Sequence, residues 1–370
     1  SRVCGIMKES HLRVSKRLSG HLAYSPGEQP SESQTVIKLN TNENPYPPSP
    51  SVRDAINHEI KLLNLYPNPT AHSLRQVIAN LHGLTASQII VGNGSDDLLN
   101  LCIRCFSDDQ LKVGMLHPSY SLYEVLSGVQ GSEMIRVPFL DNQFSLPIDR
   151  ISASGVNLFF LTNPHAPSGR FYALEELQKI LMDFSGLLVI DEAYADFAPQ
   201  NAVALLQEYE NLILTRTLSK SYSLAGLRIG YAMGHPKIIE QLDKVREVYN
   251  VDRLAQVAAI AALQDRKYFS DCLSKVCRQR EWLAQKLVQF GWSIIPSGAN
   301  FIFVEPKNKA GETGSETALS LFRYLEKHKI LVRYFPKHSQ TNSFLRISVG
   351  NESEMVILID TIQSWITTEK

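Results

Sequence analysis

The chain has 370 residues, and its 37 basic residues balance its 37 acidic residues to a formal net charge of zero. A zero net charge gives no overall attraction to nucleic acid or to an anionic membrane, and no apolar run reaches the length of a membrane span, so we expect neither as a partner. The length suits a large domain with a smaller one, or two similar domains.

The N-terminal residues are polar and rich in turn-forming types. Residues 1–20 are basic, but no apolar segment follows them, which argues against a secretion signal and leaves a transit peptide open. The five cysteines lack the spacing of a disulfide framework, and a reducing compartment is the simpler interpretation. We therefore expect a cytoplasmic protein.

The first helices are expected after the stretch NTNENPYPPSPSV, whose asparagines and prolines favour extended or turning backbone. One helix is predicted over residues 52–63 and another over 71–81, with YPNPT separating them.

Short apolar runs then alternate with helical patterns. Seven strands are predicted, at residues 88–91, 111–116, 133–137, 156–161, 187–190, 212–215 and 229–233. Several are apolar almost throughout, as expected of strands buried on both faces of a sheet. The alternation with helices predicts an α/β fold with a mostly parallel sheet.

The C-terminal part of the chain has a different pattern. Residues 237–290 are mostly helical, and the segments SIIPSGANFIFVEP, ILVRYF and FLRISVG are expected to be strands among helices. This pattern predicts a smaller α+β domain. We expect an N-terminal arm at 1–45, a large domain at 46–255 and a small domain at 256–370.

Polar clusters follow five of the predicted strands, namely GNGSDD, HPSYSLY, TNPHAPSG, DEAYADF and TLSK. Because ligands of α/β sheets bind beyond the carboxyl ends of strands, this arrangement indicates a binding site at one edge of the sheet. Gly94 permits close backbone approach, and a helix that begins near Ser95 offers free N–H groups to a phosphate. The same residues also fit a plain strand-to-helix turn capped by Ser95.

Lys220, in TLSK, has a setting that a solvated lysine does not require. It follows a buried strand, and Arg228 comes shortly after it, so burial and a nearby cation would both lower its pKa. A neutral amine can attack a carbonyl carbon. Asp191, at the end of another buried strand, suits a protonated ring nitrogen, with a helix cap or an internal salt bridge as equal alternatives. Together with Tyr120 as a stacking aromatic, these residues describe a site for pyridoxal 5′-phosphate (PLP).

Cys102 and Cys105 form a CxxC motif within a helical apolar pattern. No second CxxC follows, so core packing is favoured over metal binding or redox chemistry, and we expect no metal site.

The chain resembles the fold-type I PLP-dependent aminotransferases, and most closely the histidinol-phosphate aminotransferases. The matching motifs cover about residues 24–350 in the family's order and include YSPGEQP, KLNTNENPYPPSP, YPNPT, GNGSDD, HPSYSLY, DEAYADF, RTLSKSYSLAGLRIGY, YNVDRLAQ and FLRISVG. The resemblance implies a large domain with a mostly parallel seven-stranded sheet flanked by helices, and a small α+β domain.

The resemblance also implies roles for single residues. Lys220 would link to PLP and then carry a proton between Cα and C4′. Asp191 would hold the pyridinium N–H, Tyr194 would hydrogen-bond the ring oxygen, and Tyr120 would stack on the ring. The phosphate group would be held by residues that open a helix and by side chains after a later strand, namely Gly94, Ser95, Asp96, Thr217, Ser219 and Arg228.

Other implied roles concern the substrate and the oligomer. Tyr66 of YPNPT would reach the cofactor phosphate of the neighbouring subunit, so the resemblance implies a homodimer. Arg333 and Arg346 resemble a substrate-anion clamp, because two guanidinium groups suit a phosphate dianion and Arg346 alone suits a carboxylate. Tyr46 lies in the arm that is expected to close over the substrate.

The chain departs from the family pattern at one position. The family usually has asparagine immediately before PTG, bonded to the ring oxygen, whereas this chain has Ala166 in NPHAPSG. Asn163 or His165 could take over this bond, or Tyr194 could act alone.

The implied reaction is the PLP-dependent transamination of L-histidinol phosphate, a small-molecule substrate, with 2-oxoglutarate. Its products would be imidazole acetol phosphate and L-glutamate, and it belongs to histidine biosynthesis. Two alternatives share the scaffold: an aromatic amino acid aminotransferase and a PLP-dependent phosphothreonine decarboxylase.

Overall fold

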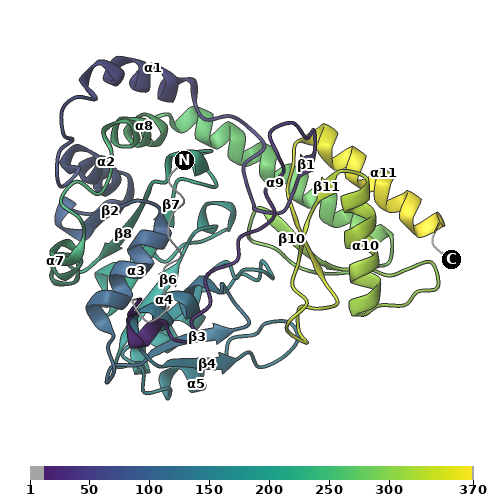
Figure 1. Cartoon of the computed structure of the whole chain (residues 1–370), viewed down its shortest axis with the longest axis horizontal. Helices are drawn as coiled ribbons and strands as arrows, with labels where there is room; N and C mark the ends of the chain where they lie inside the picture. The colour runs from purple at the N-terminus through teal and green to yellow at the C-terminus, as the bar shows by residue number, and fades with distance from the viewer. Residues whose placement is uncertain (1–11, 369–370) are drawn as a thin grey trace.

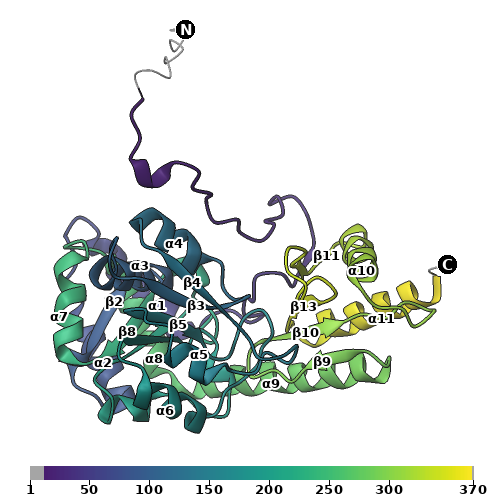
Figure 2. The same ribbon diagram turned by 90° about the horizontal axis from the view of Figure 1, so that it is seen from below.

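The computed structural model describes residues 12–368 and shows two lobes joined by a long helix (Figures 1 and 2). The large lobe contains a seven-stranded sheet, and the small lobe contains a four-stranded sheet with helices beside it. Residues 1–11, which belong to the basic N-terminal segment discussed above, lie outside the described residues.

The seven-stranded sheet contains all seven strands expected from the sequence. Its strands are β2 Ile89–Gly92, β3 Val113–His117, β4 Met134–Pro138, β5 Leu158–Thr162, β6 Leu187–Asp191, β7 Leu212–Thr217 and β8 Gly230–Gly234. Their order across the sheet is β2-β8-β7-β6-β5-β3-β4, and β8 alone in this sheet runs antiparallel to its neighbours. The predicted α/β class with a mostly parallel sheet is therefore confirmed.

Helices cover both faces of this sheet (Figure 2). Alternate residues of β5 enter different cores: Phe159 and Leu161 pack into one apolar cluster, and Leu158 and Phe160 pack into the other. Because successive strand residues point to opposite faces, a strand with both faces covered must be apolar throughout. The flanking helices are α2 His72–His82, α3 Ser95–Phe106, α4 Leu122–Gln130, α5 Ile148–Ser152, α6 Leu174–Asp183 and α7 Pro236–Val245.

The small lobe has its own core. Its antiparallel sheet has the order β12-β13-β10-β9, with β9 Ser293–Ile295, β10 Phe301–Glu305, β12 Arg333–Tyr334 and β13 Leu345–Ser348. Three helices pack beside it: α9 Arg266–Gln289, α10 Ser315–Lys327 and α11 Glu352–Thr368. Trp292, Trp365 and aliphatic side chains of these elements form a separate apolar cluster, as expected for an α+β domain.

The position of α8 bears on the division of the chain. Helix α8, Arg253–Gln264, packs against α1, Pro50–Glu59, and against α2, and its alanines belong to the core of the large lobe. The predicted boundary at residue 255 falls inside this helix. The division into domains stays a prediction, and this packing favours a boundary at Asp265, between α8 and α9.

The N-terminal arm joins the small lobe before the chain enters the large one. Strand β1, Ile37–Lys38, pairs in parallel with β11, Ile330–Leu331. Earlier in the arm, η2, Lys16–Leu18, lies against α4. The other short 3₁₀ helices are η3 Ile60–Leu62, η4 Ala86–Gln88, η5 Ala195–Phe197, η6 Val203–Gln207 and η7 Ala225–Leu227.

Two sequence expectations concern the helices: the packing of the CxxC cysteines and the possibility of a membrane span. Cys102 is fully buried in α3 against the sheet, and the Cys105 thiol contacts the backbone oxygen of Gln241, so both lie in packed surroundings. Among residues 12–368, no helix combines the length and apolarity that crossing a bilayer requires.

Candidate active site

The candidate site lies at the carboxyl edge of the seven-stranded sheet. Strands β2 and β3 to β7 all point the same way, so their ends meet at this edge. Asp191 ends β6, Lys220 follows β7 and Gly94 follows β2. The electrostatic influence of Asp96, Arg228 and other predicted residues on Lys220 shows that the fold brings them together.

Asp191 is a buried carboxylate without a cation. Its side chain accepts hydrogen bonds from the Tyr123 hydroxyl (2.7 Å) and from the backbone N–H of Ala193 (3.2 Å). Burial raises its pKa to about 6. No lysine, arginine or histidine among the described residues forms an ion pair with it, so a salt bridge does not explain its position. The arrangement suits a ligand that brings a protonated nitrogen.

Lys220 has the environment of a reactive amine. Its Nζ donates to the backbone oxygen of Thr41 at 2.9 Å. Desolvation, reinforced by the positive charges of Arg346 and Arg228, lowers its pKa to about 8. The neutral amine, which nucleophilic attack on a carbonyl requires, is thus far more populated near physiological pH than at the ordinary pKa of lysine.

The turn after β2 forms an anion cradle. Gly94 has φ +90°, and a Cβ there would lie 2.7 Å from Nη2 of Arg228, so the guanidinium rests on the glycine backbone. Ser95 is the first residue of α3, and no side chain caps this helix, which leaves its N–H groups available to an anion. This observation disfavours the alternative of a turn capped by Ser95.

Other predicted cradle residues surround Arg228. Its Nη1 donates to the Ser219 hydroxyl at 3.3 Å, and the Thr217 hydroxyl accepts the backbone N–H of Ser219 at 3.0 Å. Asp96 lies 3.9 Å from Arg228 and accepts the Tyr120 hydroxyl at 3.2 Å. Arg228 also has φ +51°, a left-handed conformation that few non-glycine residues adopt.

Tyr194 lies within the electrostatic influence of Asp191 and Arg346. Its hydroxyl accepts a hydrogen bond from Nδ2 of Asn42 at 2.9 Å, and its ring meets Phe301 edge-to-face. Burial raises its pKa, which keeps the hydroxyl protonated at neutral pH.

The residues around Ala166 answer the question left open by the sequence. Both polar ends of the Asn163 amide are bonded to the backbone of Tyr172. His165 is fully buried, with one ring nitrogen 2.6 Å from the Ser168 hydroxyl and the other 2.9 Å from the Pro118 oxygen. Desolvation lowers its pKa to about 3. Since both side chains are engaged elsewhere, neither replaces the asparagine missing at Ala166.

Arg333 and Arg346 form a pair that has no acidic partner among residues 12–368. They are directly opposite each other on β12 and β13. Nη2 of Arg346 donates to the Asn40 oxygen at 2.9 Å, its Nε has no partner among residues 12–368, and Nη2 of Arg333 donates to the Ser25 oxygen at 3.3 Å. Burial and the neighbouring Arg333 lower the pKa of Arg346. Two cations held together in this way suit an anionic ligand.

Two predicted tyrosines lie away from these contacts. Tyr46 packs against α9, with Nζ of Lys275 5.1 Å from its ring centre. Tyr66 is 76% exposed and stacks on Tyr249 at 4.5 Å. The predicted roles of both stay predictions.

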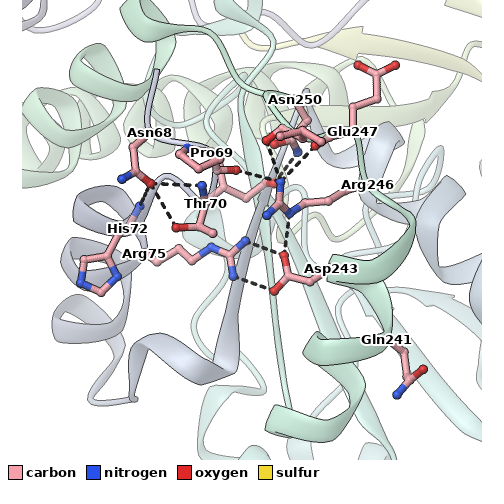
Figure 3. A network of polar contacts seen from close by, with 12 residues as sticks. Asn68, Pro69, Thr70, His72, Arg75, Gln241, Asp243, Arg246, Glu247 and Asn250 are labelled. Atoms are coloured by element: carbon pink, nitrogen blue, oxygen red, sulfur yellow. Dashed lines mark hydrogen bonds and ion pairs between the residues drawn. The ribbon is translucent and has the colours of Figure 1, made fainter. Parts of the chain in front are cut away.

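An arginine network, made of hydrogen bonds from arginine side chains, holds in place the segments that carry Tyr66 and Tyr249 (Figure 3). Asp243 binds Arg75 through two hydrogen bonds, of 2.9 and 2.7 Å, and accepts a third from Nε of Arg246. Arg246 also donates to the backbone oxygens of Pro69 and Val248, and Arg253 donates to those of Leu65 and Tyr66. This network presents the Tyr66–Tyr249 pair at the surface.

Sequence reasoning missed three asparagines of the arm. Asn40 holds Arg346 through its backbone oxygen, Asn42 bonds Tyr194, and Nδ2 of Asn44 donates to the backbone oxygen of Lys220 at 3.0 Å. Their alternation in NTNEN was a signal, because it places an asparagine at every second position of the arm.

Comparisons with known proteins agree with this geometry. The family model of aminotransferase class I and II matches residues 34–362. The chain belongs to this family. A histidinol-phosphate aminotransferase from Syntrophotalea carbinolica is 42% identical to it over 92% of this chain and 95% of the relative.

Solved structures show the same fold. The crystal structure of histidinol-phosphate aminotransferase from Sinorhizobium meliloti in complex with pyridoxal 5′-phosphate superimposes with a TM-score of 0.86 at 27% identity, covering 95% of this chain and 98% of that one. L-threonine-O-3-phosphate decarboxylase from Porphyromonas gingivalis, with a TM-score of 0.77 at 21% identity, covers 90% of this chain and 100% of that one. At that identity the second likeness shows the fold alone.

The residues at the sheet edge fit PLP. A cation-free buried carboxylate suits its ring nitrogen, the uncapped start of α3 with Arg228 suits its phosphate, and the low-pKa amine of Lys220 suits its aldehyde.

Proposed function

We propose that the chain catalyses PLP-dependent transamination of L-histidinol phosphate with 2-oxoglutarate, giving imidazole acetol phosphate and L-glutamate, a step of histidine biosynthesis. The observation that carries this proposal is the pair of Arg333 and Arg346, which has no acidic partner among residues 12–368 and whose Arg346 acts electrostatically on Lys220. Two arginines can bind a phosphate dianion in one half-reaction and the carboxylates of 2-oxoglutarate in the other.

The chain's own residues have separate tasks in this reaction. Bound PLP would supply an electron sink for the negative charge that develops at the substrate Cα. Asp191 would stay ionised against the ring N–H, and Arg228 with the start of α3 would hold the phosphate. Lys220 would take the Cα proton and return a proton at C4′, a task that suits an amine whose pKa lies near neutral pH.

The alternative substrates make different demands on the arginine pair. An aromatic amino acid presents one carboxylate and an apolar ring, so it needs Arg346 but offers Arg333 no anion. O-phospho-L-threonine offers both anions but loses carbon dioxide instead of transferring its amino group. The identity of 42% to a histidinol-phosphate aminotransferase over almost the whole chain favours L-histidinol phosphate as the substrate over these two alternatives.

We propose further that the protein acts as a cytoplasmic homodimer in which Tyr66 of each subunit reaches the cofactor phosphate of the other. The support is the surface around Tyr66, where Leu63, Leu65, Val248 and Tyr249 are also exposed. Tyr66 stacks on Tyr249, and the arginine network of Figure 3 holds the two segments that carry these exposed apolar side chains. Exposed apolar side chains grouped in this way are typical of a protein–protein contact.

The absorbance spectrum of the PLP-loaded protein tests the function directly. Addition of L-histidinol phosphate without a keto acid should bleach the visible band, and 2-oxoglutarate should restore it. Arg333→Gln should raise KM for histidinol phosphate by about 10- to 100-fold, since a charged hydrogen bond is lost, with a smaller effect on glutamate.

The same experiment separates the alternatives. A band that persists with histidinol phosphate but bleaches with L-phenylalanine would assign an aromatic aminotransferase. Carbon dioxide release from O-phospho-L-threonine without glutamate formation would assign a decarboxylase. Arg170→Gln, at a partly exposed arginine outside the site, is the matched control for Arg333→Gln.

A further inference from the structure

We propose that Asn42 is a positioning residue that directs the hydroxyl proton of Tyr194 toward the ring oxygen of the cofactor. The inference rests on the proposed PLP-dependent function. It starts from the 2.9 Å hydrogen bond that Nδ2 of Asn42 donates to the Tyr194 hydroxyl in the buried space beside Asp191.

The orientation of the Asn42 amide is determined by Ser348. The backbone N–H of Asn42 donates to the Ser348 hydroxyl, and that hydroxyl donates in turn to Oδ1 of Asn42, both at 2.9 Å. With Oδ1 occupied, the NH₂ group is the one that faces Tyr194. Asn42 can therefore only donate to the tyrosine oxygen.

A hydroxyl that accepts from Asn42 must send its own proton in another direction. Within residues 12–368, the Tyr194 hydroxyl has no acceptor of its own, and its raised pKa keeps the proton in place at neutral pH. Asp191, the proposed partner of the cofactor ring nitrogen, acts electrostatically on Tyr194. The free donor direction of Tyr194 is thus available to the cofactor oxygen.

Residues of the small lobe hold the backbone of Asn42 in position. Its φ is +57°, and its oxygen accepts from Nδ2 of Asn300 at 2.9 Å. Asparagine tolerates this left-handed conformation better than most residues. Ser348 and Asn300 belong to the small lobe and Tyr194 to the large one, so Asn42 bridges the two lobes at the site.

The hydrogen bond from Asn42 to Tyr194 is the more important because no side chain at positions 163, 165 or 166 is available to share the bond to the cofactor oxygen. Asn163 and His165 are bonded elsewhere, and Ala166 has no polar group. A hydrogen bond to the cofactor oxygen stabilises its negative charge and lowers the pKa of the visible absorbance transition. That pKa should consequently depend on both Tyr194 and Asn42.

A double-mutant cycle on this spectroscopic pKa tests the proposal. Tyr194→Phe should raise it by about 1–2 units, and Asn42→Gly, which removes the amide without straining a positive φ, should raise it by about 0.5 unit. Asn42→Asp should raise it further, because the carboxylate would accept the Tyr194 proton. In the Tyr194→Phe background, Asn42→Gly should have almost no effect.

The control is Asn308→Gly, which loses the hydrogen bond from Asn308 to the Glu312 side chain but touches no group of Tyr194. It should leave the spectroscopic pKa unchanged. An Asn42→Gly shift that persists in full without the tyrosine hydroxyl, or no shift at all, would overturn the proposal. Failure of the unmodified protein to develop a visible band with PLP would instead defeat the proposed function, and the Asn42 proposal with it.

Discussion

Two aspartates of the large lobe show how differently the same side chain can be used. Asp243, at the end of α7, is surrounded by cations: although burial opposes it, hydrogen bonds from Arg75 and Arg246 lower its pKa. Asp191, at the end of β6, has only neutral donors among the described residues, and burial raises its pKa to about 6. The negative charge of Asp243 is neutralised by arginines of the chain itself, whereas that of Asp191 would be neutralised by a cationic ligand. A buried charge without a partner of opposite charge thus indicates a binding site, and a buried charge with such a partner indicates a structural role.

The largest effect should come from the amine that acts with Asp191. Lys220→Ala removes the nucleophile and the proton carrier, so turnover should fall at least about 10⁴-fold and the visible band should be lost. Steady-state kinetics and absorbance measure both. Lys237→Ala, at an exposed lysine of α7, is the control and should retain both. Substantial turnover by the Lys220 variant would contradict the assigned role.

Asp191→Asn should separate activity from stability. Without an ionised partner for the ring nitrogen, kcat should fall about 10²- to 10³-fold. Because the folded pKa of Asp191 is raised, its contribution to stability is present below its ordinary pKa and is lost as pH rises through about 6. The variant without cofactor should therefore be more stable than the unmodified protein above pH 6, by about 2–3 kcal/mol. Urea unfolding at pH 4.5 and 7.5 measures this, and a variant destabilised at pH 7.5 would contradict it.

Asp243→Asn should have the opposite sign in stability. The folded pKa of Asp243 is lowered, so its contribution is present above the ordinary pKa and is lost as pH falls through the lowered one. The substitution leaves two arginines underbonded and should cost about 2 kcal/mol at neutral pH. Equal urea midpoints at pH 7.5 would show that the network does not stabilise the fold.

The smallest effect is a pH dependence without any substitution. The pKa of Lys220 is lowered to about 8, so the amine becomes neutral as pH rises through that value. The rate at which the protein without cofactor incorporates PLP, followed as growth of the visible band, should rise with pH and level off above about 8. A rate that keeps rising to pH 10 would mean that Lys220 titrates normally.

The sequence alone determined which residues lie at the carboxyl edge of the large sheet. Each strand of the large sheet is a short apolar run, and the functional groups lie at or just beyond the strand ends. Asp191 ends β6, Lys220 follows β7 and Gly94 follows β2. Because parallel strands end at the same edge, chain order was enough to bring these residues together.

Tertiary structure alone decided the rest. The contact of Asn42 with Tyr194 and Ser348, and that of Asn40 with Arg346, join residues more than 150 positions apart, in two lobes whose relative placement no local pattern encodes. The same holds for Asp191, whose lack of a cation became visible only when every neighbour was placed. Local periodicity specifies which face of an element is buried, but the partner of a polar group depends on the packing of the whole chain.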